Sequence, residues 1–264
     1  MATKIANYDP AVTDQSKQEL LELAEWLQTK SFTPYLVGGW TVYYHTKRSK
    51  RPPATYGQAV YDESRYDDPY GFAPLGSKDI DLVFPNSREK SSFEHYYCWE
   101  RGYKKMEELT EARIWTKTTL GSNSAEIILD LDVLSTKWKV RGSNVSWKPL
   151  LKHRTELSLE NNASILAPVK ELLLLYKCVA IVERTDKRQE PNQDVQYLDS
   201  KIWKDANDVL ALHDTGINEG RLTALAKETK LSEVLLQAKR IISENYESYQ
   251  FGQYAFSRKF LSES

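Results

Sequence analysis

The stretch GSKDIDLVF, residues 76–84, places two aspartates inside an apolar run. Asp79 and Asp81 are separated by one residue, so a β-strand here directs both side chains to the same face. Aspartate is depleted in strands because its short polar side chain favours turns and helix caps. The stretch therefore predicts a strand, closed by Pro85 and Asn86, whose acidic face needs a compensating positive charge.

A second acidic strand is predicted from AEIILDLDVLS, residues 125–135. A period of two puts its apolar side chains on one face, which must pack against helices, and its acidic side chains on the other. The acidic face carries Glu126, Ile128, Asp130 and Asp132, and the apolar face carries Ile127, Leu129, Leu131 and Val133. If the acidic faces of the two strands meet, a cation must offset their mutual repulsion.

Mg²⁺ is the expected cation, with Mn²⁺ as the alternative, because Mg²⁺ prefers carboxylate oxygens, waters and substrate phosphates. Two carboxylates from one strand and a third from its neighbour can hold two such ions, the arrangement used for in-line phosphoryl or nucleotidyl displacement. A single Asp-x-Asp triplet also occurs by chance, and Asp79 would then cap a turn while Asp81 lies on an exposed edge strand.

A glycine pair lies upstream in LVGGWTVYYH, residues 36–45, between an expected short strand and an expected helix. Gly38 and Gly39 permit a positive φ and a close approach of the backbone to a ligand. The N-terminus of the following helix offers free N–H groups and the positive end of its dipole to a phosphate. An ordinary strand-to-helix turn explains the pair equally well when it is considered alone.

The remainder of the chain divides near residue 167 into a part of strands and helices and a part of helices only. Residues 46–77, rich in Pro, Gly, Tyr and charge, are expected to form a long insertion. Asn161-Asn162 marks the turn of a hairpin over 155–167. Further helices are expected over 14–30, over 87–103 with Ser87 as N-cap, and over 168–187 with Pro168 in the first turn, and then over 198–214, 218–229 and 231–254.

Composition excludes several classes of protein. The formal net charge is −1, so no overall basic field attracts nucleic acid, although a local basic patch such as residues 45–53 remains compatible with phosphate contact. The two cysteines, Cys98 and Cys178, have no metal-ligand or redox spacing and are expected to be buried. No secretory signal is present, and the longest apolar run is short and contains Lys177, so a cytoplasmic protein without a membrane span is expected.

Five short motifs, in this order, resemble the DNA polymerase beta-like nucleotidyltransferase superfamily. They are GGWTV, SKDID, LDVLS, LLLLYKCVAIVER and KDANDVLAL, and they extend over roughly residues 30–215. The pattern is most similar to the stand-alone prokaryotic members, including the abortive-infection toxin type. The resemblance implies an α/β (α+β) fold, with a small mixed-sheet nucleotidyltransferase domain over residues 1–167 and an all-helical domain over residues 168–264.

The resemblance also implies roles for the acidic residues. Asp79 and Asp81 would bind both metal ions. A third carboxylate would bind the catalytic metal and help to deprotonate the acceptor hydroxyl. Asp132 is favoured for this role because LDVLS matches the motif better, and Asp130 is its rival because it shares the same face.

Other residues would bind the nucleotide. Gly38, Gly39 and Thr41 would cradle the triphosphate, and Ser77 would donate a hydrogen bond to a phosphate oxygen. Lys177 would reach the β- and γ-phosphates, unless it is a lysine that extends to solvent along its helix. Motif residues Arg184, Lys204, Asp205 and Asp208 complete the pattern; Lys204 and Asp205 are also compatible with a purely structural role or a solvated face.

The implied activity is transfer of an NMP from an NTP, such as ATP, to a hydroxyl acceptor with release of pyrophosphate. The acceptor would be an RNA 3′ end, a protein or a small molecule, and a toxin-type member would have an antitoxin-like partner. The alternative is a non-catalytic nucleotide-binding or regulatory module on the same fold. The chain departs from the toxin-type pattern in two ways. Leu75 stands where an arginine is common, and the spacing between Gly39 and Asp79 is long. Arg48, Arg51 or Arg65 would have to supply the positive charge of the missing arginine.

Overall fold

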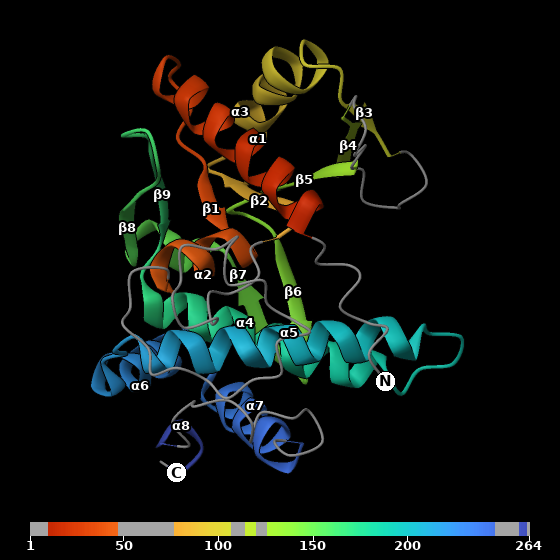
Figure 1. Ribbon diagram of the computed structural model, residues 1–264. Helices are drawn as coiled ribbons and strands as arrows, with labels where there is room; N and C mark the ends of the chain where they lie inside the picture. The colour runs from red at the N-terminus through yellow and green to blue at the C-terminus, as the bar shows by residue number, and fades with distance from the viewer. Residues whose placement is uncertain (1–9, 47–76, 107–113, 120–125, 246–258, 263–264) are drawn as a thin grey trace.

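The computed structural model describes residues 10–46, 77–106, 114–119, 126–245 and 259–262. The predicted insertion, the basic run after Thr46, Leu75 and the three candidate arginines therefore lie outside the described residues. A seven-stranded mixed sheet lies between two groups of helices (Figure 1). This arrangement confirms the predicted fold class, a mixed sheet followed in sequence by helices.

The sheet has the strand order β3-β4-β5-β2-β1-β9-β8. Strand β2 pairs in parallel with β5, and β1 pairs in parallel with β9, whereas the other neighbours are antiparallel. A separate hairpin, β6–β7, stands beside the sheet. The strands are β1 (Tyr35–Val37), β2 (Asp79–Phe84), β3 (Lys104–Lys105), β4 (Ile114–Thr118), β5 (Glu126–Val133), β6 (Lys137–Val140), β7 (Ser143–Ser146), β8 (Arg154–Ser158) and β9 (Ser164–Pro168).

One face of the sheet packs against the helices α1 and α3. Its core contains the apolar side chains that alternate with the aspartates, such as Ile80, Leu82, Ile127, Leu129 and Leu131, all essentially inaccessible to solvent. The predicted alternation of the two acidic strands is therefore confirmed. The helices on this side and at the β1 end are α1 (Pro10–Gln28), α2 (Gly38–Thr46) and α3 (Ser87–Phe93), the last continued by a π-helical turn, η3 (Glu94–Trp99).

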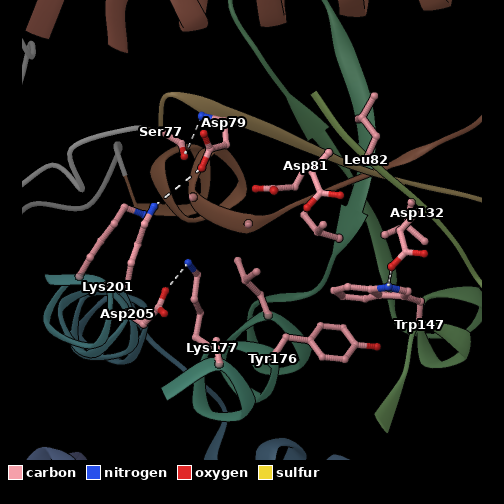
Figure 2. A pocket seen from close by; sticks show the side chains of 18 of the residues that line it. Ser77, Asp79, Asp81, Leu82, Asp132, Trp147, Tyr176, Lys177, Lys201 and Asp205 are labelled. Atoms are coloured by element: carbon pink, nitrogen blue, oxygen red, sulfur yellow. Dashed lines mark hydrogen bonds and ion pairs between the residues drawn. The ribbon is translucent and has the colours of Figure 1, made fainter. Parts of the chain in front are cut away.

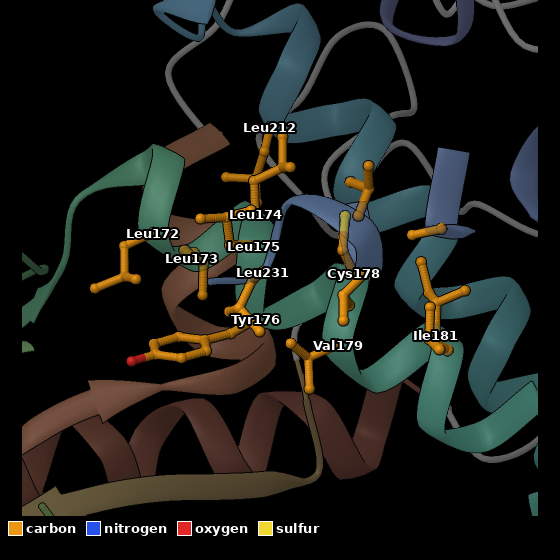
Figure 3. Close-up of a cluster of buried hydrophobic side chains, with 14 of the residues drawn as sticks. Leu172, Leu173, Leu174, Leu175, Tyr176, Cys178, Val179, Ile181, Leu212 and Leu231 are labelled. Atoms are coloured by element: carbon orange, nitrogen blue, oxygen red, sulfur yellow. The ribbon is translucent and has the colours of Figure 1, made fainter. Parts of the chain in front are cut away.

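The C-terminal helices pack below the other face of the sheet in Figure 1. Helix α4 is central, because its leucines and the side chains of Cys178, Val179 and Ile181 are buried between the sheet and its neighbours (Figure 3). The same continuous core includes Val37 and Val83 of the sheet. The elements are the 3₁₀ turn η4 (Lys148–Leu151), α4 (Lys170–Lys187), α5 (Val195–Asp214), α6 (Glu219–Glu228), α7 (Ser232–Glu244) and the short α8 (Lys259–Ser262).

Two local predictions were wrong. The N-cap of α3 is Asn86 rather than Ser87, because the Asn86 side chain accepts a hydrogen bond from the Glu89 N–H at 2.9 Å. Pro168 ends β9 instead of opening the helix, and Val169 occupies the N-cap of α4. The β6–β7 hairpin was not predicted; its turn places Arg141 and Gly142 at positive φ, of 47° and 81°.

Other expectations are confirmed. The hairpin β8–β9 turns at Asn161 and Asn162, whose φ values are 55° and 59°. Cys98 and Cys178 are both free and buried. In the part of the chain that the structure describes, no helix combines the length and the apolar character that crossing a membrane requires.

Candidate active site

A cavity of about 210 Å³ lies between the acidic face of the sheet and helices α4 and α5 (Figure 2). Strands β2 and β5 supply four aspartates to it, and the β1–α2 turn supplies both predicted glycines. Helices α4 and α5 supply basic side chains from the opposite wall. The lining also includes Ser77, Val83, Trp147, Leu173, Tyr176, Lys177, Arg184, Lys201, Lys204 and Asp205.

The register of the parallel pair β2–β5 fixes how the aspartates meet. Asp81 lies directly opposite Asp130, whereas Asp79 lies opposite Ile128 and Val83 lies opposite Asp132. Burial raises the pKa of Asp81 to about 7, and the nearby charges of Asp130 and Asp79 add to this effect. We call Asp79, Asp81 and Asp130 the acidic cluster. Glu126, predicted on the same face, is exposed at the start of β5 and does not line the cavity.

Asp132 also faces the cavity but is held by hydrogen bonds from three donors. Its Oδ2 accepts from Trp147 Nε1 at 2.7 Å, and its Oδ1 accepts from the Val133 N–H at 2.8 Å and from the Thr136 hydroxyl. These donors fix the orientation of the carboxylate. The strand register thus brings Asp130, rather than the sequence-favoured Asp132, nearest to Asp81.

The acidic cluster does not form a complete metal site from protein groups alone. Among the described residues, no group of three His, Cys, Asp or Glu side chains is arranged to hold a metal ion. Mg²⁺, however, commonly takes only one or two carboxylates and fills its shell with waters and substrate phosphates. Asp79 Oδ1 is buried without a hydrogen-bond partner among the described residues and is available for such a role.

The glycine pair is required by the close approach of the backbone to the cavity side chains. Gly38 has a φ of +72°, and a Cβ at this position would lie 1.9 Å from Asp81 Oδ2. A Cβ at Gly39 would lie 2.8 Å from Lys204 Nζ and 3.0 Å from Ser77 Cβ. A side chain at Gly38 would therefore displace Asp81, and one at Gly39 would crowd Ser77 and Lys204.

Of the two predicted phosphate-binding residues Ser77 and Thr41, the structure places only Ser77 at the cavity. Ser77 lines the cavity, and its hydroxyl accepts a long hydrogen bond from the Asp79 N–H at 3.4 Å. Thr41, in contrast, is fully buried within α2 and does not line the cavity. The geometry therefore brings Ser77, but not Thr41, to a position where a phosphate could contact it.

Two buried carboxylates hold three cations on the helical wall of the cavity. Lys177 Nζ lies 2.9 Å from Asp205 Oδ1 and 2.7 Å from Asp208 Oδ2, and Lys204 Nζ lies 3.2 Å from Asp208 Oδ2. Arg184 forms an ion pair with Asp205. Lys177 is therefore anchored by acidic partners and does not extend to solvent along its helix.

The pKa values of this group follow from burial and charge. Burial lowers the pKa of Lys204 to about 8, although the charge of Asp208 opposes this effect. Burial alone would raise the pKa of Asp208, but the charges of Lys177 and Lys204 outweigh it and lower the pKa below its usual value. Asp208 is thus an anion paired with the ammonium groups of both Lys177 and Lys204 at the cavity wall.

Lys201 was not predicted as a site residue. Its Nζ reaches from helix α5 to within 3.8 Å of Asp79 Oδ2, and burial lowers its pKa. The signal available in the sequence is its position three residues before Lys204, which places both lysines on the same face of α5. Trp147 and Tyr176 were also missed, because nothing in their local sequence indicates that they face the cavity.

Comparison with known proteins gives structural likeness only. No family model matches the chain, and no curated protein matches it in sequence. A nucleotidyltransferase-like protein from Paracoccidioides brasiliensis shares 15% identity with a TM-score of 0.44, over 86% of this chain and 92% of that chain.

The antibiotic-resistance factor ANT(2″)-Ia is similar in two structures. One is a solution structure with 13% identity and a TM-score of 0.39, and the other is a crystal structure in complex with adenylyl-2″-tobramycin with 13% identity and a TM-score of 0.43. Each covers 82% of this chain and 97% of that chain. The chain is thus structurally similar to nucleotidyltransferase-like proteins, and at these TM-scores the likeness supports no conclusion on activity.

Proposed function

We propose that the chain is a Mg²⁺-dependent nucleotidyltransferase that moves an NMP from an NTP to a hydroxyl acceptor and releases pyrophosphate. The observation that carries the proposal is the opposition, across one cavity, of the acidic cluster and the basic side chains of α4 and α5. A metal–triphosphate complex needs this distribution of charge, because the carboxylates face the cation and the lysines face the phosphates.

The carboxylates have distinct tasks in this proposal. Asp79 and Asp81 would hold Mg²⁺, and Asp130 is the better-placed third carboxylate because it lies opposite Asp81. Bound there, Mg²⁺ would neutralise charge on the phosphates and lower the pKa of the acceptor hydroxyl. Asp132 keeps a fixed orientation through Trp147 and would contact the acceptor rather than the metal.

The remaining wall would bind the nucleotide. Lys177, Lys201 and Lys204 would neutralise the β- and γ-phosphates and the departing pyrophosphate. The Gly38-Gly39 backbone at the start of α2 lies close enough to Asp81 to contact a phosphate held beside it. We keep the division into a catalytic domain of residues 1–167 and a helical domain of residues 168–264 as part of the proposal, because the two would close on the nucleotide from opposite walls.

The test is transfer of labelled NMP in the presence of Mg²⁺ to RNA, protein and small-molecule fractions. The double variant Asp79→Asn/Asp81→Asn should lose transfer. Asp199→Asn, which breaks a partly exposed ion pair between Asp199 of α5 and Arg188 at the end of α4, should retain it. Persistent transfer by the double variant would refute the assignment of these carboxylates.

A non-catalytic nucleotide-binding module is the second candidate, and the lack of a preassembled three-ligand metal group among the described residues favours it. It predicts a thermal shift with Mg²⁺ and NTP but no release of pyrophosphate with any acceptor. The finer assignment to the toxin type, with an antitoxin-like partner, rests on the sequence motifs alone.

A further inference from the structure

The basic side chains of the cavity wall differ in the carboxylates that they face. Three of them form ion pairs with the buried carboxylates of helix α5, namely Lys177, Lys204 and Arg184. Lys201 instead reaches the sheet, where its Nζ lies 3.8 Å from Asp79 Oδ2 (Figure 2). Within the described ranges, this is the one ion pair that joins a basic side chain to the acidic cluster. Lys201 therefore offsets part of the charge of a proposed metal ligand.

The position of Lys201 on α5 explains its choice of partner. Asp205 lies one turn after Lys201, at the spacing of an ion pair along a helix face. The carboxylate of Asp205, however, faces Lys177 and Arg184 of α4. One turn before Lys201, the centroid of the Tyr197 ring lies 5.4 Å from Lys201 Nζ, which is a cation–π contact. The Lys201 ammonium thus lies at the cavity wall with an aromatic ring and the Asp79 carboxylate as neighbours.

A metal ion on Asp79 would compete with this ammonium. Asp79 Oδ1 is buried and has no hydrogen-bond partner among the described residues, whereas Oδ2 of the same carboxylate faces Lys201. A cation bound to Asp79 would therefore stand close to a second positive charge. Like charges a few ångströms apart repel each other, and the repulsion is stronger at a partly buried site than in water. Binding of a metal ion alone is thus opposed by Lys201.

A nucleotide removes this opposition, because it offers Lys201 a second anionic partner. Lysine carries a compact charge on a flexible stem, so its ammonium can move while its backbone stays in the helix. Lys201 lines the same cavity as Ser77, Lys177 and Lys204, where the proposed function seats the phosphates. The Lys201 ammonium can therefore exchange a carboxylate oxygen for a phosphate oxygen without leaving the cavity.

We propose that Lys201 couples metal binding to nucleotide binding. In the nucleotide-free protein its ammonium is the counter-ion of Asp79, and it transfers to the triphosphate when metal and NTP enter together. The chain then binds metal alone weakly and binds metal with NTP strongly. This agrees with the lack of a preassembled three-ligand metal group among the described residues. The inference rests on the proposed function, and it differs from simple phosphate binding because it makes Lys201 an opponent of metal alone.

The test measures binding of Mn²⁺ to the full chain without nucleotide, by electron paramagnetic resonance of the free ion. Lys201→Met keeps the apolar stem and removes the charge. It should bind Mn²⁺ about fivefold more tightly than the wild type, near the lower end of typical coupling between sites. Lys201→Arg keeps a positive charge and should bind Mn²⁺ as weakly as the wild type. Lys227→Met, at an exposed lysine of helix α6, is the matched control for the loss of one charge and should leave binding unchanged.

A second measurement separates coupling from a purely structural role. It uses an NTP analogue with a methylene group between the α- and β-phosphates, at saturating Mn²⁺, with the base that gives the wild type its largest thermal shift. Lys201→Met should bind this analogue about fivefold more weakly than the wild type, because the ammonium that would hold a phosphate is absent. The two affinities thus change in opposite directions, whereas damage to the fold would lower both. Lys201→Gln takes the place of Lys201→Met if the methionine variant does not fold.

The outcomes distinguish this inference from the proposed function. Binding of Mn²⁺ by Lys201→Met that is no tighter than that of the wild type, or an equal gain in Lys227→Met, would overturn the coupling. Unchanged affinity for the analogue would overturn it as well, because Lys201 would then not reach the phosphates. Failure of the wild type to bind the analogue with Mn²⁺ would instead refute the nucleotidyltransferase itself, and the coupling with it.

Discussion

Replacement of Asp81 by asparagine should stabilise the metal-free protein at alkaline pH. Asp81 is partly buried at the cavity wall opposite Asp130, and burial raises its pKa from the ordinary 3.8 to about 7. The protonated carboxyl of Asp81 contributes stability that is fully present below about pH 4. Because the folded-state pKa is raised, this stability is lost progressively as the pH rises from about 4 through about 7. The amide of the Asp81→Asn variant has no charge to gain, so the gap between variant and wild type widens with pH.

The magnitude follows from the same shift. A difference of about three pKa units at about 1.4 kcal/mol each sets a ceiling of about 4 kcal/mol on the cost of ionising Asp81 in the folded state. At about 2–4 °C per kcal/mol for a chain of this size, the ceiling corresponds to an increase in Tm of about 10 °C at pH 8. At pH 5, about one pKa unit above the ordinary 3.8, the expected difference is only about 1.6 kcal/mol, because the unfolded chain is already ionised there while Asp81 of the folded wild type is still protonated.

The assay is thermal or urea unfolding in EDTA at pH 5 and at pH 8, with Asp199→Asn as the control. Asp199 forms an exposed ion pair with Arg188, and its loss should change stability by less than about 1 kcal/mol at either pH. Addition of Mg²⁺ and NTP at pH 8 should raise the Tm of the wild type more than that of Asp81→Asn, because the variant lacks a ligand for the cation. A variant that is less stable than the wild type at pH 8, or a gap that is the same at both pH values, would refute the reasoning.

Three other predictions concern the same region. Gly38→Ala should destabilise the protein by more than about 2 kcal/mol, because its Cβ would overlap Asp81 at a φ of +72°, whereas Gly142→Ala, also at positive φ but with open space around it, should cost only about 1 kcal/mol in urea unfolding. Asp208→Asn should cost about 3 kcal/mol, because it leaves Lys177 and Lys204 buried without this partner, and an unfolding midpoint equal to that of the wild type would contradict the ion-pair assignment. Trp147→Phe removes the donor to Asp132 and should raise the KM for the acceptor more than the KM for the NTP in steady-state kinetics; an equal rise in both would place Trp147 at the nucleotide instead.

The local pattern of the chain was sufficient to predict the strands that carry the site. Alternation of apolar and acidic residues defined both faces of β2 and β5, and the apolar faces are buried as expected. Asn161-Asn162 predicted the turn of the β8–β9 hairpin, since asparagine tolerates a positive φ. These features depend on a residue and its immediate neighbours, which is why sequence alone determined them.

The tertiary structure decided which of these residues meet. The alternation of side chains puts Asp130 and Asp132 on one face of β5. It cannot fix the register of β5 against β2, because the two strands lie far apart in the sequence. Packing of the sheet fixes that register and places Asp130 opposite Asp81. The need for glycine at position 38 follows only from the tertiary structure, in which the Asp81 side chain lies where a Cβ of residue 38 would be. The basic side chains of the cavity come from α4 and α5, and its aromatic side chains are those of Trp147 and Tyr176. The positions of these residues beside the aspartates depend on long-range burial of apolar surface rather than on any local signal.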